Sequence, residues 1–469
     1  MSKISPLRQL ANIISESVDK IEAEMAKANL EYPSLDEPFN PFSPGEGAAM
    51  APTIRPSAAL IVGACAQLSA IVNIPALTLY DTIGAFHVSS GIRVAVEGNV
   101  AEILRGQPQG LHVNDIAAKN GMDGPTLARV LRLLATHHIF IEVAPNVFKN
   151  NRISSMMDTL KSVEEIKADP VNKHTGTPGV AALVEHTSDE IMKASAFLPE
   201  ALEKPAKGSL DDLSTTPFAI AFKTQKYGFD WFEEPGNEFR LKRFAAAMEG
   251  ASRVDPPNAI LSGFKWESLG SKTVVVDIGG GMGHLSLKIA QQHKDLRFVV
   301  QDRAPVIKEA EGFWKTNLPS ALEDGTVTLQ VHDFFTPQPK ADVGVFLCRM
   351  ILHDYGKNKA TTILKHLRAA AGSKTKLLIV EQVVPYACRG SSSKFSAKLH
   401  IEPPQPLLAN GGKASAIAYL GDMQMYVGLL GEERTIGTFE ELLRSAGWEI
   451  EDVFPIPGSV HSQILAVPV

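Results

Sequence analysis

The sequence predicts an α/β protein in which a C-terminal doubly wound, mainly parallel sheet follows an N-terminal, mainly helical region that contains a winged helix. Three observations support this fold class. Short apolar strands alternate with helical segments from Thr273 onward, which is typical of sheets built by crossover connections. A glycine cluster directly follows the first of these strands. Two short helices and a hairpin are predicted over residues 111–150.

The composition excludes several classes of protein. A chain of 469 residues suggests two or three domains, and a net charge of −6 argues against a nucleic-acid partner. The three cysteines, Cys65, Cys348 and Cys388, are too few and too scattered for a disulfide framework or a zinc site, so we expect a reducing, cytoplasmic compartment. The His-Asp pairs at 332–333 and 353–354 also lack metal-ligand spacing, and we expect no metal.

Residues 1–57 are predicted to form an N-terminal arm and a linker. Apolar residues at helical spacing predict an amphipathic helix over about residues 5–30, for which a partner subunit is one candidate contact. Residues 32–56, rich in Pro, Ser, Gly and Ala, predict an extended linker. Residues 58–77 are the most apolar long stretch, but polar residues and a proline interrupt them. We therefore expect a buried helix of a soluble protein and no membrane span.

Residues 58–165 are predicted to form the winged-helix domain. A short helix over 113–121 precedes a second helix, and residues 139–148 form a hairpin. Such a module can bind DNA, but its second helix offers only Arg129 and Arg132 to a groove, and the chain is acidic. We favour a structural, dimer-forming use.

Residues 166–255 are predicted to be a helical connecting region that walls a substrate pocket. Aromatic residues gather between Pro217 and Gly250. Most of these rings are expected to pack the domain junction. A few of them, Phe222 and Trp231 among these, are expected to line a cavity, because ligand pockets favour aromatic walls.

The last domain, residues 256–469, begins with a strand that ends in the glycine turn from Asp277 to His284. The turn lacks the third glycine of a dinucleotide fingerprint, and no Gly-Lys-Ser or Gly-Lys-Thr follows it. A bare glycine backbone still lets a ligand approach closely. S-adenosylmethionine fits such a turn, because it has an amino-acid tail and no phosphate.

Polar residues follow several strands that would end at one edge of the sheet. Asp302 ends the second strand, nineteen residues after Gly283, where it can accept hydrogen bonds from ribose hydroxyls. Asp333 and Phe334 follow the third strand and could provide an acceptor for an adenine amine and an aromatic wall. Capping of a turn is the alternative for Asp333.

His353, in the segment after the fourth strand, is the candidate general base, since the ordinary pKa of histidine lies near neutrality. Glu381 ends the next strand and Glu433 lies in a later loop. A carboxylate on one ring nitrogen would fix the tautomer that leaves the other nitrogen free to accept a proton. Methyl transfer from a sulfonium is an in-line displacement, for which the protein mainly supplies positioning.

Residues 276–283, 301–305 and 352–355 resemble motifs of the plant caffeate-type and fungal secondary-metabolite O-methyltransferases. The resemblance covers nearly the whole chain from about Ala58. It implies a winged-helix dimerisation domain, a homodimer, and a Rossmann-like class I methyltransferase domain that binds S-adenosylmethionine. In this resemblance Asp277, Gly279, Gly281, Asp302, Arg303, Asp333, Phe334 and Arg349 bind the cofactor. The catalytic residues it implies are His353, Asp354, Glu381 and Glu433. We expect the acceptor pocket to be lined by Phe222, Trp231, Met248, Met350, Met425 and Leu429, of which Met248 and Met425 fall in segments that line the pocket in this family.

Two departures from the plant pattern stand out. Residues 386–416 are longer and low in complexity, which predicts a mobile surface loop or lid. Leu429 replaces a polar substrate contact, which suggests a more apolar acceptor. The predicted function is O-methylation of a hydroxyl on an aromatic or polyketide-derived metabolite. The fungal branch also contains dehydratases and pericyclases in which the sulfonium acts as a fixed charge, and this is the alternative.

Overall fold

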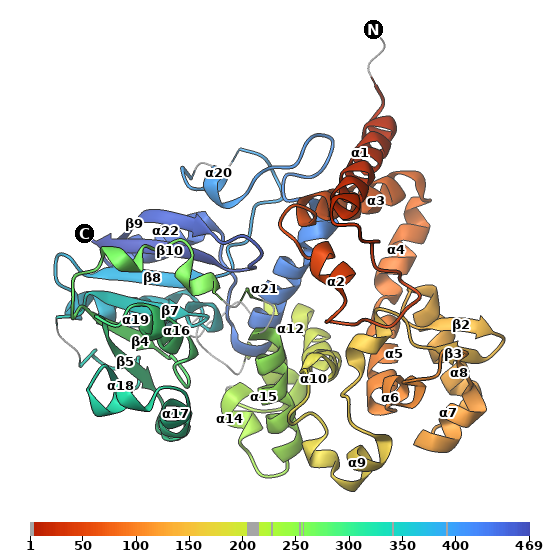
Figure 1. Cartoon of the computed structure of the whole chain (residues 1–469), viewed down its shortest axis with the longest axis horizontal. Helices are drawn as coiled ribbons and strands as arrows, with labels where there is room; N and C mark the ends of the chain where they lie inside the picture. The colour runs from red at the N-terminus through yellow and green to blue at the C-terminus, as the bar shows by residue number, and fades with distance from the viewer. Residues whose placement is uncertain are drawn as a thin grey trace. The chain divides into compact units, whose positions relative to one another are not determined.

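The computed structural model describes residues 4–203, 215–226, 228–252, 255–256, 258–339, 342–390 and 393–469. These residues form two compact units, and Figure 1 labels helices and strands of both. The N-terminal unit contains the described residues up to 252 together with Gln405–Leu407, and the C-terminal unit contains 255–404 and 408–469, with the gaps given above.

The C-terminal unit is built on a seven-stranded sheet with the order β6-β5-β4-β7-β8-β10-β9. The strands are β4 (Val274–Ile278), β5 (Arg297–Asp302), β6 (Val327–Val331), β7 (Val345–Arg349), β8 (Lys376–Glu381), β9 (Trp448–Pro455) and β10 (Ser462–Pro468). The first five are parallel, and β10 pairs antiparallel with β8 and β9. The predicted doubly wound sheet is thus confirmed. The chain reverses direction across the sheet at β4 and β7, where such sheets bind ligands.

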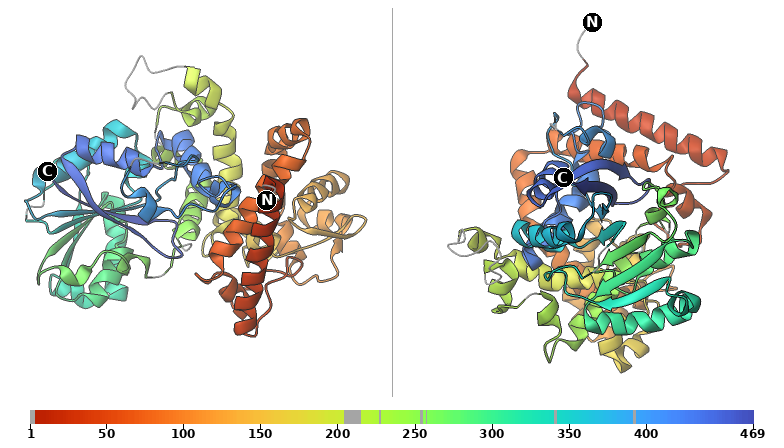
Figure 2. Two further views of the ribbon diagram at one scale, coloured as in Figure 1. Left: turned by 90° about the horizontal axis from the view of Figure 1, so that it is seen from above. Right: turned by 90° about the vertical axis from the view of Figure 1, so that its left-hand side faces the viewer.

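Helices cover both faces of this sheet (Figure 2). One face packs against α16 (His284–Gln292), α17 (Ala304–Asn317) and α18 (Pro319–Glu323), and the other against α19 (Lys357–Ala370) and α22 (Ile436–Ser445). Burial on both faces explains why the central strands are almost wholly apolar. The expected alternation of strands and helices fails at one place: between β6 and β7, the described residues 332–339 and 342–344 contain no helix.

The N-terminal unit contains the predicted winged helix. Helices α7 (Val113–Asn120) and α8 (Gly124–Thr136) precede the hairpin of β2 (Ile141–Ala144) and β3 (Val147–Lys149), and β1 (Leu111–His112) pairs with β3. Other helices of this unit are α4 (Pro75–Gly84), α5 (Phe86–Glu97), α6 (Val100–Leu104), α9 (Val163–Ala168), α10 (Val180–His186), α11 (Met192–Ser195) and α12 (Leu198–Glu203).

The predicted N-terminal amphipathic helix is confirmed as α1 (Pro6–Lys27), whose apolar face packs on α3 (Arg55–Val72) through Leu10 (Figure 1). The expected extended linker is wrong in part, because α2 (Pro44–Ala49) lies within it. Glu46 of α2 is held by a double hydrogen bond from Arg152, at 2.8 and 2.5 Å. A long-range ion pair therefore stabilises a short helix that the local composition disfavours.

The expected burial of the helix after the linker is wrong for this chain taken alone. Only Ser57, Gly63 and Ala64 of α3 are buried. By length and composition alone α3 could cross a membrane. Val62 and Val72 are 47% and 65% exposed. The described residues of this unit therefore leave much of the apolar surface of α3 uncovered.

The aromatic residues of 217–250 mainly pack on one another within the N-terminal unit, and their expected place at a domain junction stays a prediction. They lie on α13 (Pro217–Phe222), α14 (Gly228–Phe232) and α15 (Glu238–Ser252). The rings of Phe218 and Trp231 meet edge to face at 5.2 Å, and Phe232 stacks on Phe244 at 5.1 Å. Tyr227, counted with this cluster from sequence, lies outside the described residues.

The stretch 386–416, expected to be a mobile surface loop or lid, is partly buried among its described residues. It contains α20 (Ser396–Leu399), and its residues 405–407 belong to the N-terminal unit. Leu407 is buried beside Leu10 and Ala64, and the Gln67 side chain donates a 2.8 Å hydrogen bond to the Pro406 carbonyl. Part of this insertion is therefore a core element of that unit.

Candidate active site

The glycine turn after β4 uses two of its glycines for different reasons. Gly281 has φ +59°, and a Cβ atom there would meet nothing within 4 Å, so this side of the turn is open to a ligand. Gly283, with φ +84°, is the N-cap of α16, and a Cβ atom there would lie 2.8 Å from the Trp314 indole nitrogen. Gly281 keeps the turn accessible, and Gly283 allows α16 to pack on α17.

Asp302, the last residue of β5, faces this turn. The backbone N–H of Gly281 donates to its Oδ2 at 2.8 Å, and the N–H of Arg303 donates to its Oδ1 at 2.7 Å. A carboxylate has about four lone-pair positions, so these two bonds leave capacity for ribose hydroxyls. Arg303 is the N-cap of α17, which places its backbone at the same edge of the sheet.

Asp277 has a contact that the sequence did not indicate. Its carboxyl group is buried beneath Gly280, where a Cβ atom would approach it to 2.6 Å, and it accepts a 2.7 Å hydrogen bond from the Ser286 hydroxyl. Burial, aided by the charge of Asp302, raises the pKa of Asp277 to about 6. The bond ties β4 to α16 and so holds the glycine turn in shape, while a direct cofactor contact stays a prediction.

The segment after β6 provides an aromatic wall beside the turn. A Cβ atom at Gly279 would lie 3.4 Å from the ring of Phe334, which packs in turn on Phe335 at 5.0 Å. Asp333 accepts a 3.0 Å hydrogen bond from the N–H of Phe335, which is the turn-capping role left open from sequence. Phe334 is thus placed to pack against a ligand of the turn.

Arg349 ends β7 at the same edge. Its Nη2 donates to Oδ2 of Asp255 at 3.2 Å, and its charge lowers the pKa of the otherwise raised Asp277. Arg349 therefore lies within electrostatic range of the glycine turn.

His353 lies in the short turn Leu352–Asp354 and is buried. Its Nδ1 is 2.7 Å from Oε1 of Glu433, and its Nε2 is 3.4 Å from Oδ1 of Asp354. Burial disfavours the imidazolium, but the bond to Glu433 and the charges of Asp354 and Glu381 outweigh it and raise the pKa of His353 to about 9. The ring therefore carries a proton at neutral pH. Burial raises the pKa of Asp354 to about 6.

Of the two candidate acids, Glu433 contacts the imidazole and Glu381 does not bond to it. Oε1 of Glu381 instead accepts hydrogen bonds from the backbone N–H groups of Ile351, Leu352 and His353, at 3.2, 2.6 and 3.2 Å. Burial, opposed by His353 and Arg434, raises the pKa of Glu381. Glu381 thus holds the backbone that presents the ring.

The loop around Glu433 also holds this backbone, through residues that sequence reasoning missed. The buried guanidinium of Arg434 donates to the carbonyls of Leu352 and Tyr355 at 2.7 and 2.6 Å. The N–H of Glu432 donates to the carbonyl of His353 at 2.8 Å. The sequence feature that could have indicated Glu432 and Arg434 is their position next to Glu433 in the chain.

The predicted acceptor residues fall in both units. Met350, Met425 and Leu429 lie in the C-terminal unit, and the last two are on α21 (Ala416–Leu429). Met350 has φ +52° and begins the segment that leads to His353. Phe222, Trp231 and Met248 lie in the N-terminal unit, where the rings of Phe222 and Trp231 are 4.9 Å apart. A pocket shared by all six stays a prediction.

No group of three or more His, Cys, Asp or Glu side chains suited to a metal ion occurs among the described residues. Near His353, one carboxylate oxygen of Glu433 meets the imidazole, and one of Glu381 accepts backbone N–H groups.

A mainly parallel sheet with a glycine turn, an acid after the second strand and a buried imidazole at one edge has the architecture of the class I methyltransferase fold. Residues 211–402 match the model of the O-methyltransferase domain, and residues 80–159 match the O-methyltransferase dimerisation domain. The chain is 41% identical to an O-methyltransferase of Armillaria gallica, over 99% of this chain and 100% of that one. It is 39% identical to 4-O-methyltransferase 1 of Phanerochaete chrysosporium, over 95% of each. The chain belongs to the O-methyltransferase family.

Solved structures share the fold at lower sequence identity. A pericyclic reaction enzyme matches with a TM-score of 0.63 and 18% identity, over 98% of this chain and 100% of that one. The complex of LepI with SAM matches with a TM-score of 0.63 and 19% identity, over 91% and 100%. These likenesses concern the fold alone.

Proposed function

We propose that this enzyme transfers the methyl group of S-adenosylmethionine to a phenolic hydroxyl of an aromatic or polyketide-derived secondary metabolite, with His353 as general base. The observation that carries the proposal is the buried pair of His353 and Glu433 next to the glycine turn. The two sites adjoin, since a Cβ atom at Gly279 would lie 2.6 Å from the side chain of Ile351, two residues before His353.

Features of the turn fit the cofactor. Gly281 leaves an open face, Asp302 keeps lone pairs for ribose hydroxyls, and Phe334 offers a ring for adenine. The bound cofactor supplies an electrophilic methyl carbon on a sulfonium. In the reaction the acceptor oxygen forms a bond to this carbon, the bond from sulfur to carbon breaks, and S-adenosylhomocysteine leaves.

The chain's own task is to take up the acceptor proton. After His353 has lost its proton to solvent, its neutral ring can accept one from the substrate hydroxyl, and Glu433 then stabilises the imidazolium. A pKa of about 9 for His353 lies close to the ordinary pKa of about 10 for a phenol. The proton transfer is therefore nearly balanced for a phenol, which supports this acceptor class. Leu429 supports an apolar acceptor.

The test uses S-adenosylmethionine with a labelled methyl group and a panel of phenolic aromatic and polyketide compounds. We expect labelled product and S-adenosylhomocysteine in equal amounts. Product that forms without S-adenosylhomocysteine would support the dehydratase or pericyclase alternative. The protonated state of His353 at neutral pH favours that alternative, because an imidazolium can donate a proton to a leaving hydroxyl or a carbonyl.

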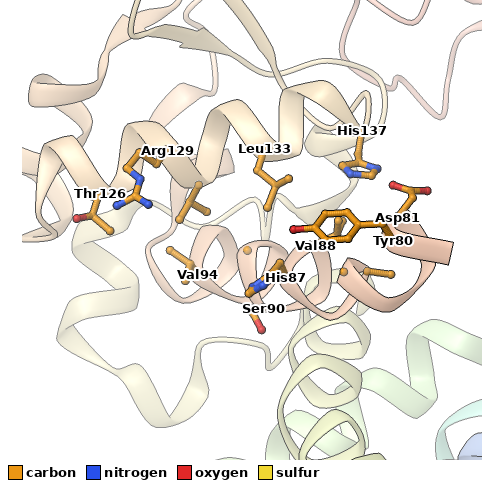
Figure 3. Close-up of a pocket in the computed structure, with 14 residues that line it drawn as sticks. Tyr80, Asp81, His87, Val88, Ser90, Val94, Thr126, Arg129, Leu133 and His137 are labelled. Atoms are coloured by element: carbon orange, nitrogen blue, oxygen red, sulfur yellow. The ribbon is translucent and has the colours of Figure 1, made fainter. Parts of the chain in front are cut away.

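We also propose that the enzyme is a homodimer in which a second copy covers the apolar surface of α3 to α5. Large apolar side chains are exposed there by 54 to 74%: Ile74, Leu77, Leu79, Tyr80, Ile83 and Phe86. Tyr80 also lines a groove of about 600 Å³. In this groove Val88 and Val94 of α5 face Leu133 of α8, and Arg129 stands at the rim (Figure 3). The dimerisation model spans residues 80–159, which include every residue lining this groove.

Light scattering on the purified protein tests the dimer. We expect two copies per particle for the unaltered enzyme and a monomer for Leu77→Asp, whereas Leu202→Asp, at another exposed leucine outside this surface, should remain dimeric. A monomeric unaltered protein would remove the proposal.

All three cysteines are free thiols, which supports a cytoplasmic location.

A further inference from the structure

A carboxylate outside the predicted site gathers side chains from three places in the C-terminal unit. Asp255 is the first residue of this unit after the long helical region. Its Oδ1 accepts a 2.5 Å hydrogen bond from the Ser459 hydroxyl, and its Oδ2 lies 2.7 Å from Nδ1 of His461 and 3.2 Å from Nη2 of Arg349. Ser459 is itself fixed, because its Oγ accepts the backbone N–H of His461 at 2.9 Å.

The surroundings of Asp255 keep it charged. Its side chain is only 12% exposed, and burial alone would favour the neutral acid. The hydrogen bonds from His461, Ser459 and Arg349 outweigh burial and hold the pKa of Asp255 well below its ordinary value. Asp255 is therefore a fixed anion over the working pH range.

The position of this anion relates it to the cofactor edge. Ser462, the first residue of β10, pairs with Glu381, the last residue of β8, so the turn with Ser459 and His461 lies at the carboxyl end of β8. Arg349 ends the neighbouring strand β7, where it pairs with Val380. Asp255 thus links the β9–β10 turn to a side chain whose charge reaches Asp277 in the glycine turn.

We propose that Asp255, held by Ser459 and His461, is a positioning residue that aims the guanidinium of Arg349 at the cofactor-binding turn. A free arginine side chain samples many rotamers, and the loss of this rotamer entropy opposes any single placement. A buried, already oriented carboxylate removes part of that cost before the ligand arrives. One nitrogen of the guanidinium meets Asp255, and its other donors can meet an acceptor atom of the ligand. This inference rests on the proposed S-adenosylmethionine site.

The test is a double-mutant cycle read by calorimetry with S-adenosylhomocysteine, which needs no turnover. We expect Asp255→Asn to weaken binding about tenfold, in the range of coupled neighbours. Arg349→Gln should weaken it at least as much, and the Asp255→Asn change should add nothing in the Arg349→Gln background. Additive effects of the two substitutions would show that Asp255 acts independently of Arg349 and would overturn the proposal.

Further variants separate positioning from general stability. His461→Asn keeps a donor close to Nδ1 and should bind nearly as the unaltered enzyme does, whereas His461→Leu should behave like Asp255→Asn. Glu451→Gln removes a carboxylate of the same unit from an exposed pair with Lys376 and should leave the affinity unchanged. An unaltered affinity in Asp255→Asn overturns the inference alone. If the unaltered enzyme does not bind S-adenosylhomocysteine, the proposed function fails, and the inference fails with it.

Discussion

Oε1 of Glu433 lies 2.7 Å from Nδ1 of His353, although 80 positions separate the two residues in the chain. Both side chains are about 8% exposed, so water screens their interaction only weakly. The pair decides which nitrogen of the ring can face a substrate and how strongly the ring holds a proton. The catalytic behaviour of the proposed base should therefore depend on Glu433.

We expect turnover to rise with pH and to level off above about 9. The pKa of His353 is raised to about 9, so the ring is protonated below that pH and can accept a substrate proton only above it. Glu433→Gln removes the adjacent charge, lowers the pKa of His353 and should move the rising limb of the kcat profile to lower pH. Glu432→Gln, at a carboxylate that is 40% exposed and bridged to Arg434, is the control and should leave the limb in place. A profile that does not move in Glu433→Gln would contradict the assignment.

His353→Ala should reduce kcat by roughly 10²- to 10⁴-fold, the usual contribution of a general base. The affinity for S-adenosylhomocysteine in calorimetry should stay nearly unchanged, because Asp302 and the glycine turn remain in place. His366→Ala, on the outer helix α19, serves as a histidine control. Turnover retained in His353→Ala would remove this residue from the mechanism.

Asp302→Ala should weaken cofactor binding and leave kcat nearly unchanged, which is the opposite of the effect expected for His353→Ala. The variant loses the acceptor for the Gly281 N–H as well as the predicted ribose contact, so the cofactor should bind at least tenfold more weakly. At saturating cofactor, kcat should approach that of the unaltered enzyme, since His353 and Glu433 are untouched. Steady-state kinetics at varied cofactor concentration distinguish the two effects, and an unchanged KM for the cofactor would refute this role of Asp302.

Gly431→Ala should impair catalysis through the backbone of the proposed base. A Cβ atom at Gly431 would clash with the His353 carbonyl oxygen, so one of the two loops must move. We expect a lower kcat with little change in cofactor affinity. Gly312→Ala, in α17, is the matched control, because a Cβ atom there meets nothing within 4 Å. Equal activity of the two variants would show that the loop tolerates the displacement.

Arg243→Met should destabilise the N-terminal unit. Arg243 is buried and donates to Glu185 and Asp189, at 2.9 Å each, and also to Glu190. Its loss would leave buried carboxylates without their main counter-charge, which costs about 3–5 kcal/mol. Denaturant unfolding, followed by tryptophan fluorescence, measures the change. Arg132→Met, which breaks the exposed pair with Glu142, should change little. A similar small change in Arg243→Met would mean that water or a rearranged side chain replaces the guanidinium.

Local patterns in the chain were sufficient to predict much of the fold. The alternation of apolar strands with helices predicted the sheet, and Asp277, Gly281 and Asp302 lie together at the carboxyl edge of its strands, as the strand ends predicted. The winged helix was equally visible. Hydrophobic period, turn residues and strand ends are properties of short segments, and these segments adopt the same local structure in almost any compact chain.

The sequence by itself thus determined the class of fold, the edge of the sheet where the candidate site lies, and the choice of His353 as the candidate base. Only the tertiary structure decided that Glu433 bonds to the imidazole while Glu381 holds the backbone, and that Asp255 meets Arg349. It also decided that Leu407 is buried against the N-terminal helices. Each of these contacts joins segments far apart in the chain. Their energy depends on which groups burial brings within hydrogen-bond distance, and spacing along the sequence carries no record of that distance.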